Sequence, residues 1–128
     1  GWLRLVSLPL AQVFLGEAYP QMERRIDTLF MTDEDLGDGS GSRPPTGAIH
    51  ELCQALDRKS KEDGKKVRVQ ILAHSMGTMV ANRMVAKYPE LDYREVVYMG
   101  AACSIEQFAA SVPPQLRSHK DMTFFNVC

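Results

Sequence analysis

The chain has 128 residues, of which 45% are hydrophobic and 24% are charged, a composition typical of a globular protein with its own core. Lys and Arg total 15 against 16 Asp and Glu, so the formal net charge is -1. This balance excludes the basic footprint of a nucleic-acid-binding protein and of a polybasic membrane anchor. We therefore expect no nucleic-acid partner.

The first 15 residues are apolar without a clear period, and Arg4 and Pro9 interrupt them. The stretch is shorter than the roughly 20 residues of a spanning helix, and it lacks the basic start of a secretory signal. We predict a strand or buried loop here and no integral membrane segment. Cys53, Cys103 and Cys128 show neither a metal-ligand spacing nor a secreted disulfide pattern, which indicates free thiols and a cytoplasmic protein.

Apolar residues at helical spacing predict a helix over about residues 20–31, with Pro20 in its first turn. Residues 33–45 are acidic and then rich in Gly, Ser and Pro, which predicts a loop. Asp33 and Asp35 begin a spacing like that of a calcium-binding loop. However, Gly37 stands at a ligand position and Asp38 replaces the required Gly, so the pattern favours a solvated loop over a metal site.

The remaining chain alternates between helical and strand patterns. Helices are predicted over residues 46–63, from Ser75 to Pro89, and from Ser104 to Pro113, and strands over residues 67–73, 95–99 and 122–127. This order predicts an α/β fold with parallel strands joined by right-handed crossovers. We expect one partial domain, with an apolar segment, helix and loop in residues 1–45 and a βα core in residues 46–128.

A short motif, Ala73-His74-Ser75-Met76-Gly77, stands between the first predicted strand and its helix. A serine hydroxyl is a weak nucleophile unless it is presented alone beside a base. A sharp turn from strand to helix would present Ser75 at the carboxyl edge of the sheet, where open α/β sheets bind ligands. The N–H of Met76 would then stabilise an oxyanion. These features predict acyl transfer through an acyl-serine, most simply ester hydrolysis.

The segment from Leu72 to Thr78 resembles the nucleophile elbow of α/β-hydrolase esterases and lipases, including those with Ala in place of the first Gly. The resemblance covers about residues 46–128 and implies an incomplete parallel-sheet sandwich of the α/β-hydrolase type. It implies that Ser75 is the nucleophile and the Met76 N–H an oxyanion donor, without a metal or organic cofactor. In this family the acid and then the histidine follow the serine. We therefore expect both to be missing here, and the chain to be an inactive part of a larger hydrolase.

The chain's own histidines are weak substitutes for the missing base. We interpret His74 as a pocket-lining or packing residue, because its side chain points away from the serine at such a turn. His119 and Asp121 precede the third predicted strand, so we expect them at the opposite edge of the sheet as a solvated pair. His50 begins a helix near the carboxyl edge; an exposed helical histidine is favoured there over a base.

Two further site assignments stay open. Cys103 follows the second predicted strand at the carboxyl edge, where it either lines the pocket or packs as a small residue. The second oxyanion donor normally comes from an earlier loop, and the only candidate is the segment Phe14-Leu15-Gly16.

Three functions are consistent with this sequence. The leading hypothesis is a serine hydrolase of the esterase or lipase type acting on a small-molecule ester or acyl substrate. The second is a non-catalytic binding protein that retains the hydrolase core, with another chain covering the open sheet edge. The third is an acyltransferase or thioesterase, which would use the same motif with a different acceptor.

Overall fold

The computed structural model describes residues 16, 18–32, 35 and 47–127. The chain divides into two compact units, residues 1–47 and 48–128, and each is described by itself. The predictions for residues 1–15, including Phe14-Leu15, and for most of the loop at 33–45, including the calcium pattern, lie outside the described residues.

The first unit contains the predicted helix: residues 16 and 18–28 are helical, so the helix begins before the predicted residue 20. It ends in a tight turn in which the Leu29 N–H donates to the Ile26 carbonyl at 2.9 Å. The helix therefore stops three residues before the predicted end. Beyond it, the backbone N–H and the hydroxyl of Thr32 both donate to the Asp35 carboxylate, at 2.9 and 2.8 Å.

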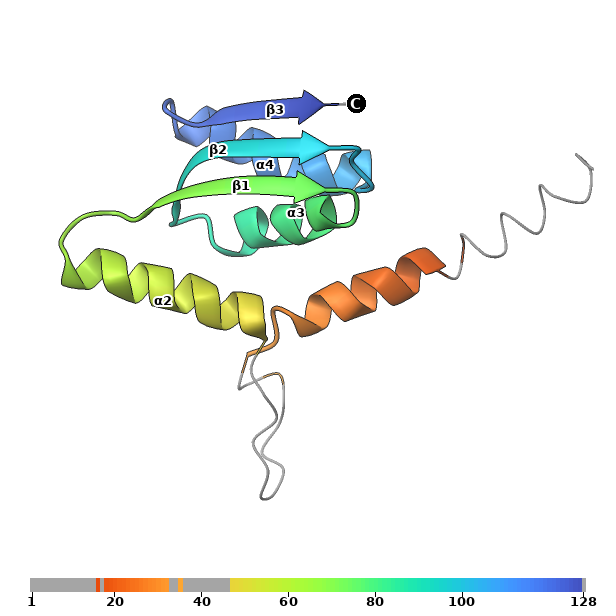
Figure 1. The fold of residues 1–128 in the computed structure, drawn as a ribbon, viewed down its shortest axis with the longest axis horizontal. Helices are drawn as coiled ribbons and strands as arrows, with labels where there is room; N and C mark the ends of the chain where they lie inside the picture. The colour runs from red at the N-terminus through yellow and green to blue at the C-terminus, as the bar shows by residue number, and fades with distance from the viewer. Residues whose placement is uncertain (1–15, 17, 33–34, 36–46, 128) are drawn as a thin grey trace, which may run out of the picture. The chain divides into compact units, whose positions relative to one another are not determined.

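The second unit alternates helices and strands in the predicted order. Its elements are α2 (Ala48–Glu62), β1 (Arg68–His74), α3 (Gly77–Lys87), β2 (Asp92–Met99), α4 (Ile105–Ser118) and β3 (Thr123–Val127). All strand pairs are parallel, in the order β1-β2-β3 (Figure 1). The predicted α/β class with parallel strands is thus confirmed. None of the helices in the described residues combines the length and the apolar character needed to cross a membrane.

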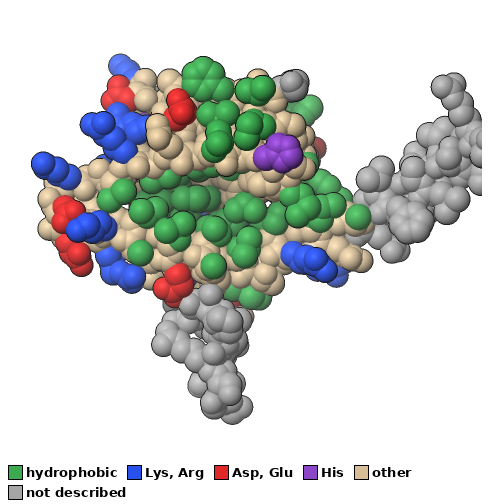
Figure 2. Space-filling model, viewed as in Figure 1, with side chains coloured by type: hydrophobic (Ala, Val, Ile, Leu, Met, Phe, Trp, Pro, Cys, Tyr) green, Lys and Arg blue, Asp and Glu red, His purple; other side chains and the backbone are tan. Residues whose placement is uncertain are grey.

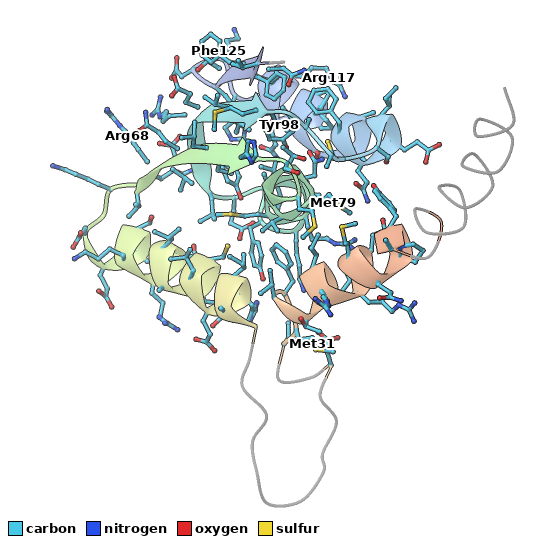
Figure 3. The ribbon with its side chains drawn as sticks, turned by 45° about the vertical axis from the view of Figure 1, so that its right-hand side comes forward. Met31, Arg68, Met79, Tyr98, Arg117 and Phe125 are labelled. Carbon is cyan, nitrogen blue, oxygen red and sulfur yellow. The ribbon has the colours of Figure 1, made fainter. Side chains whose placement is uncertain are left out.

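The two faces of the sheet differ. Both α3 and α4 lie against one face, where Ala73, Val96 and Tyr98 are buried (Figure 1). Because strand side chains alternate, the register places the intervening residues on the opposite face, here called the outer face. The outer face consists of Gln70, Leu72, His74, Glu95, Val97, Met99, Thr123, Phe125 and Val127. Figure 3 labels Tyr98 and Phe125, which belong to opposite faces.

Buried hydroxyl groups tie the helices to β2. Tyr98 is 1% exposed and donates its hydroxyl to the Asn82 side-chain oxygen on α3 at 2.6 Å. Ser111 on α4 donates to the same oxygen at 2.7 Å. Tyr93, 2% exposed, donates to the Tyr88 carbonyl at 2.9 Å. Burial raises the pKa of both Tyr93 and Tyr98, so both phenols remain protonated donors at neutral pH.

The predicted end of α4 before Pro113 is wrong, because the helix continues through Pro113 and Pro114 to Ser118. Proline cannot donate to the carbonyl four residues back, which removes bonds to the carbonyls of Ala109 and Ala110. Both alanines are exposed, so water can reach these carbonyls. Beyond the prolines the helix buries Gln115, and the Ser118 hydroxyl donates to the Pro114 and Gln115 carbonyls, both at 3.1 Å.

The second strand begins at Asp92, three residues before the predicted start. The added residues include the charged Asp92 and Arg94. In the structure the Arg94 guanidinium pairs with Asp92 at 3.0 Å and with Asp121 at 3.2 Å, which places these charges at the rim of the sheet. In the same region, the pairing of β1 with β2 shifts its register between Val69 and Gln70.

Replacing Pro114 with Ala should stabilise the second unit. The alanine restores an N–H inside α4, and proline costs about 3 kcal/mol relative to alanine in a helix interior. The greater entropy of the unfolded alanine chain offsets up to about 1 kcal/mol of this gain. We expect the free energy of unfolding to rise by about 2 kcal/mol in urea denaturation. An unchanged or lower value would show that the proline ring contributes packing that alanine loses.

Candidate functional site

Ser75 forms the turn between β1 and α3, as the motif predicts. Its backbone has φ = +50°, and no other described residue except glycine has a positive φ. The strand ends at His74 and the helix begins at Gly77, so the reversal is completed within two residues. The Ser75 N–H donates to the Met99 carbonyl at 3.0 Å, which joins the turn to the end of β2. The half-buried Ser75 therefore sits at the carboxyl edge of the sheet.

Thr78 holds the other side of this turn, a role that the sequence analysis missed. Both its N–H and its hydroxyl donate to the Ser75 carbonyl, at 3.1 and 2.7 Å. The Thr78 hydroxyl oxygen also accepts from the Ala102 N–H at 3.2 Å. Thr78 is 0% exposed. The sequence did contain a signal for this role, namely a polar residue in the first turn of the helix that follows the serine turn.

The start of α3 carries no side-chain cap. Met76 is the N-cap residue, no side chain bonds the first turn, and that turn contains no acidic residue. Within the described part of the chain, the Met76 N–H has no hydrogen-bond partner. An uncapped helix N-terminus has unpaired N–H donors and a positive partial charge. This arrangement can stabilise a negative oxygen bound near Ser75.

Positions 73 and 77 face each other across the turn, and small residues occupy both. A Cβ atom built on Gly77 would lie 3.8 Å from the Ala73 Cβ, so the two positions face each other in van der Waals contact range. Gly100, which follows β2, has φ = +53° and lies beside His74, whose Nε2 would be 4.0 Å from a Cβ at that position. The His74 side chain is exposed and belongs to the outer face.

None of the three histidines is hydrogen-bonded to Ser75, and all three belong to the described residues. No hydrogen bond to the Ser75 hydroxyl is found within those residues either. His119 follows the last turn of α4 and precedes β3, which places it at the amino edge of the sheet, opposite Ser75, as predicted. It bonds Ser118 at 3.0 Å, whereas Asp121 pairs with Arg94; the two do not form the expected pair.

The expectation that His50 lies near the carboxyl edge and is exposed is wrong. Its Nδ1 is 2.6 Å from the Tyr88 hydroxyl, and its Nε2 is 2.8 Å from the Gln54 amide nitrogen. Tyr88 caps the end of α3 that is remote from Ser75. A helix of 11 residues is about 16 Å long, so this separation excludes His50 as a base for Ser75. The sequence shows the direction of α2 but not how far along the sheet it begins.

Cys103 lines a pocket at the carboxyl edge, together with residues of β2, α4 and β3. His74 is not among the residues that line this pocket. Cys53 is instead buried in α2, where desolvation and then the charge of Glu90 raise the pKa of its thiol to about 11. Both cysteines are free thiols. No cluster of three or more metal-ligating side chains occurs among the described residues.

Replacing Ser75 with Gly should stabilise the fold relative to Ser75→Ala. A positive φ costs a residue with a Cβ about 1–2 kcal/mol, and glycine adopts it freely. We expect Ser75→Gly to be about 1 kcal/mol more stable than Ser75→Ala in urea denaturation. Equal stabilities would indicate that the turn relaxes to a negative φ.

Replacing Thr78 with Val keeps the shape of the side chain but removes its hydroxyl. The Ala102 N–H then loses an acceptor and the Ser75 carbonyl loses a donor, so we expect a loss of about 1–3 kcal/mol in the free energy of unfolding. Thr123→Val is the matched control: Thr123 is exposed, and its loss should change stability by less than about 0.5 kcal/mol. Equal losses in the two variants would contradict the role of Thr78.

The comparisons with known proteins add no assignment to this geometry. No family model, no curated protein and no solved structure matches the chain. The case for a site at Ser75 therefore depends on three local features: the strained backbone of the serine, the uncapped start of α3, and the contacts that hold the turn.

Proposed function

We propose that this chain carries the nucleophile of a serine hydrolase of the esterase or lipase type, built on an α/β-hydrolase core. The observation that carries the proposal is the backbone of Ser75, held at φ = +50° directly before an uncapped helix. Strain of this kind persists only where the surrounding structure enforces it, and it is concentrated at functional sites. The order β1-β2-β3, with Ser75 after β1, supports the same assignment.

The chemistry follows from the placement of two groups. The Ser75 hydroxyl oxygen attacks the carbonyl carbon of an ester, and its proton passes to a base. The carbonyl oxygen becomes an oxyanion, which the Met76 N–H and the positive end of α3 stabilise. The alcohol leaves with a proton from the base, and water then hydrolyses the acyl-serine. An acceptor other than water would make the same site an acyltransferase.

The base is supplied by another polypeptide segment, because none of His50, His74 and His119 is hydrogen-bonded to Ser75. We propose that a histidine and its orienting carboxylate are supplied by another polypeptide segment. The chain by itself should hydrolyse esters very slowly, since loss of triad members costs several orders of magnitude in rate. The free thiols of Cys53 and Cys103 support a reducing, cytoplasmic location.

A second candidate function is a non-catalytic interaction protein that retains the same core. Parallel sheets are normally covered on both faces, yet the outer face exposes Leu72 at 72%, Phe125 at 52% and Val127 at 55%. Figure 2 shows hydrophobic side chains gathered over the strands of this face. A partner chain that covers it would bury this surface. Partner binding that survives Ser75→Ala, without any acylation of Ser75, would favour this candidate.

Imidazole in solution can stand in for the missing histidine and so tests the hydrolase proposal. The chain is incubated with a fluorophosphonate probe, with and without imidazole, and the adduct is read by intact mass and peptide mapping. We expect almost no adduct without imidazole, and a labelling rate at Ser75 that rises about tenfold or more when imidazole is added, since a general base contributes 10²–10⁴ when it is positioned.

Two variants control this experiment. Ser75→Ala should abolish the imidazole-dependent adduct. Ser118→Ala should leave the imidazole-dependent adduct unchanged. The Ser118 hydroxyl does have a histidine nitrogen 3.0 Å away, but Ser118 lies at the carboxyl end of a helix, where an oxyanion is destabilised. Imidazole-dependent labelling spread over several serines, or none at Ser75, would contradict the proposal.

A further inference from the structure

An apolar pocket opens beside the Ser75 turn. It has a volume of about 210 Å³ and lies between the end of β2, the start of α4 and β3. Its wall includes Ala101, Cys103 and Ile105 from the segment that links β2 to α4 and from the first turn of that helix. Ile105 is 86% exposed and stands at the lip of the pocket.

Three aromatic rings make up the other wall. Tyr98, Phe108 and Phe124 contact one another, with ring centroids 5.1 to 6.3 Å apart. The Tyr98 hydroxyl is bonded to Asn82, which holds that ring in place. Phe108 and Phe124 remain half-buried, so part of their ring surface faces the pocket. Such a wall is rigid and apolar, and aromatic groups pack well against it.

The pocket is joined to Ser75 through one residue. The Ala102 N–H lies 3.4 Å from the Ser75 carbonyl oxygen and donates to the Thr78 hydroxyl. Its two neighbours, Ala101 and Cys103, both line the pocket. The contacts of Ala102 that fix the backbone of the serine therefore also fix the two pocket-lining residues on either side of Ala102.

We propose that this pocket binds the apolar acyl group of the ester that Ser75 attacks, and that the group is about the size of one aromatic ring. The reaction in this inference rests on the proposed function, whereas the binding does not. A cavity of about 150 Å³ lined by apolar side chains holds benzene, so 210 Å³ accommodates a benzoyl group or a short alkyl chain. The substrates are then small aryl or short-chain esters.

Binding is measured with methyl benzoate and the Ser75→Ala variant, which separates binding from chemistry. We expect saturable shifts in the amide ¹H–¹⁵N spectrum, in the low-millimolar range, at Ala101, Cys103 and Ile105. Ala101→Trp should fill the pocket and weaken this binding at least tenfold. Ala110→Trp is the matched control, because Ala110 is exposed on α4 and does not line the pocket; it should leave the affinity unchanged.

The native lining provides a second readout that does not depend on the tryptophan variants. Saturating methyl benzoate should slow alkylation of Cys103 by iodoacetamide at least fivefold, and should leave the much slower reaction of the buried Cys53 unchanged. Absence of saturable binding, shifts confined to other surfaces, or unprotected Cys103 would overturn the pocket.

The two proposals fail separately. Binding of methyl benzoate without imidazole-dependent labelling of Ser75 would keep the pocket and remove the hydrolase. Labelling of Ser75 without binding of methyl benzoate would keep the hydrolase and remove the pocket.

Discussion

The turn at Ser75 is the constraint on which the rest of the site depends. A serine at φ = +50° is unfavourable in isolation, and it persists here because hydrogen bonds hold it from both sides. Its N–H is bound to the end of β2, and its carbonyl is bound by Thr78 and approached by Ala102. The same bonds set the hydroxyl at the sheet edge, aim the start of α3 at it, and place the segment that leads into the apolar pocket.

The interior of the second unit keeps this arrangement rigid through polar as well as apolar contacts. The Asn82 oxygen accepts from Tyr98 on β2 and from Ser111 on α4, so one amide joins the two helices to the central strand. Buried hydrogen bonds of this kind are costly to leave unmade, which favours one packing arrangement over others. Since Tyr98 also forms a wall of the pocket, core packing and pocket shape are linked.

The asymmetry of the sheet bears on how the site becomes complete. One face is covered by α3 and α4, while the outer face exposes Leu72, Phe125 and Val127. Ser75 lies at the edge shared by both faces, and the three histidines form no hydrogen bond to it. A polypeptide segment that supplies the base would approach the same edge. Under the proposed function, one partner segment would both supply the base and cover the apolar surface.

The order and type of the elements and the place of the serine turn could be predicted from the amino-acid sequence. Periodicity separates helices from strands, and Ala73 and Gly77 beside Ser75 mark a tight reversal, because these signals are local. The sequence did not predict that α4 runs through Pro113 and Pro114 to Ser118, because proline in a local pattern indicates the end of a helix.

Which distant groups meet could not be predicted in this way, because it depends on how the elements pack. His50 lies beside Tyr88 rather than near Ser75, because the position of α2 along the sheet depends on packing that its own residues do not encode. Thr78 and Ala102 are 24 residues apart, yet they hold one turn. The pocket likewise forms from β2, α4 and β3 together. Local patterns predict elements, whereas contacts between elements depend on how the whole unit packs.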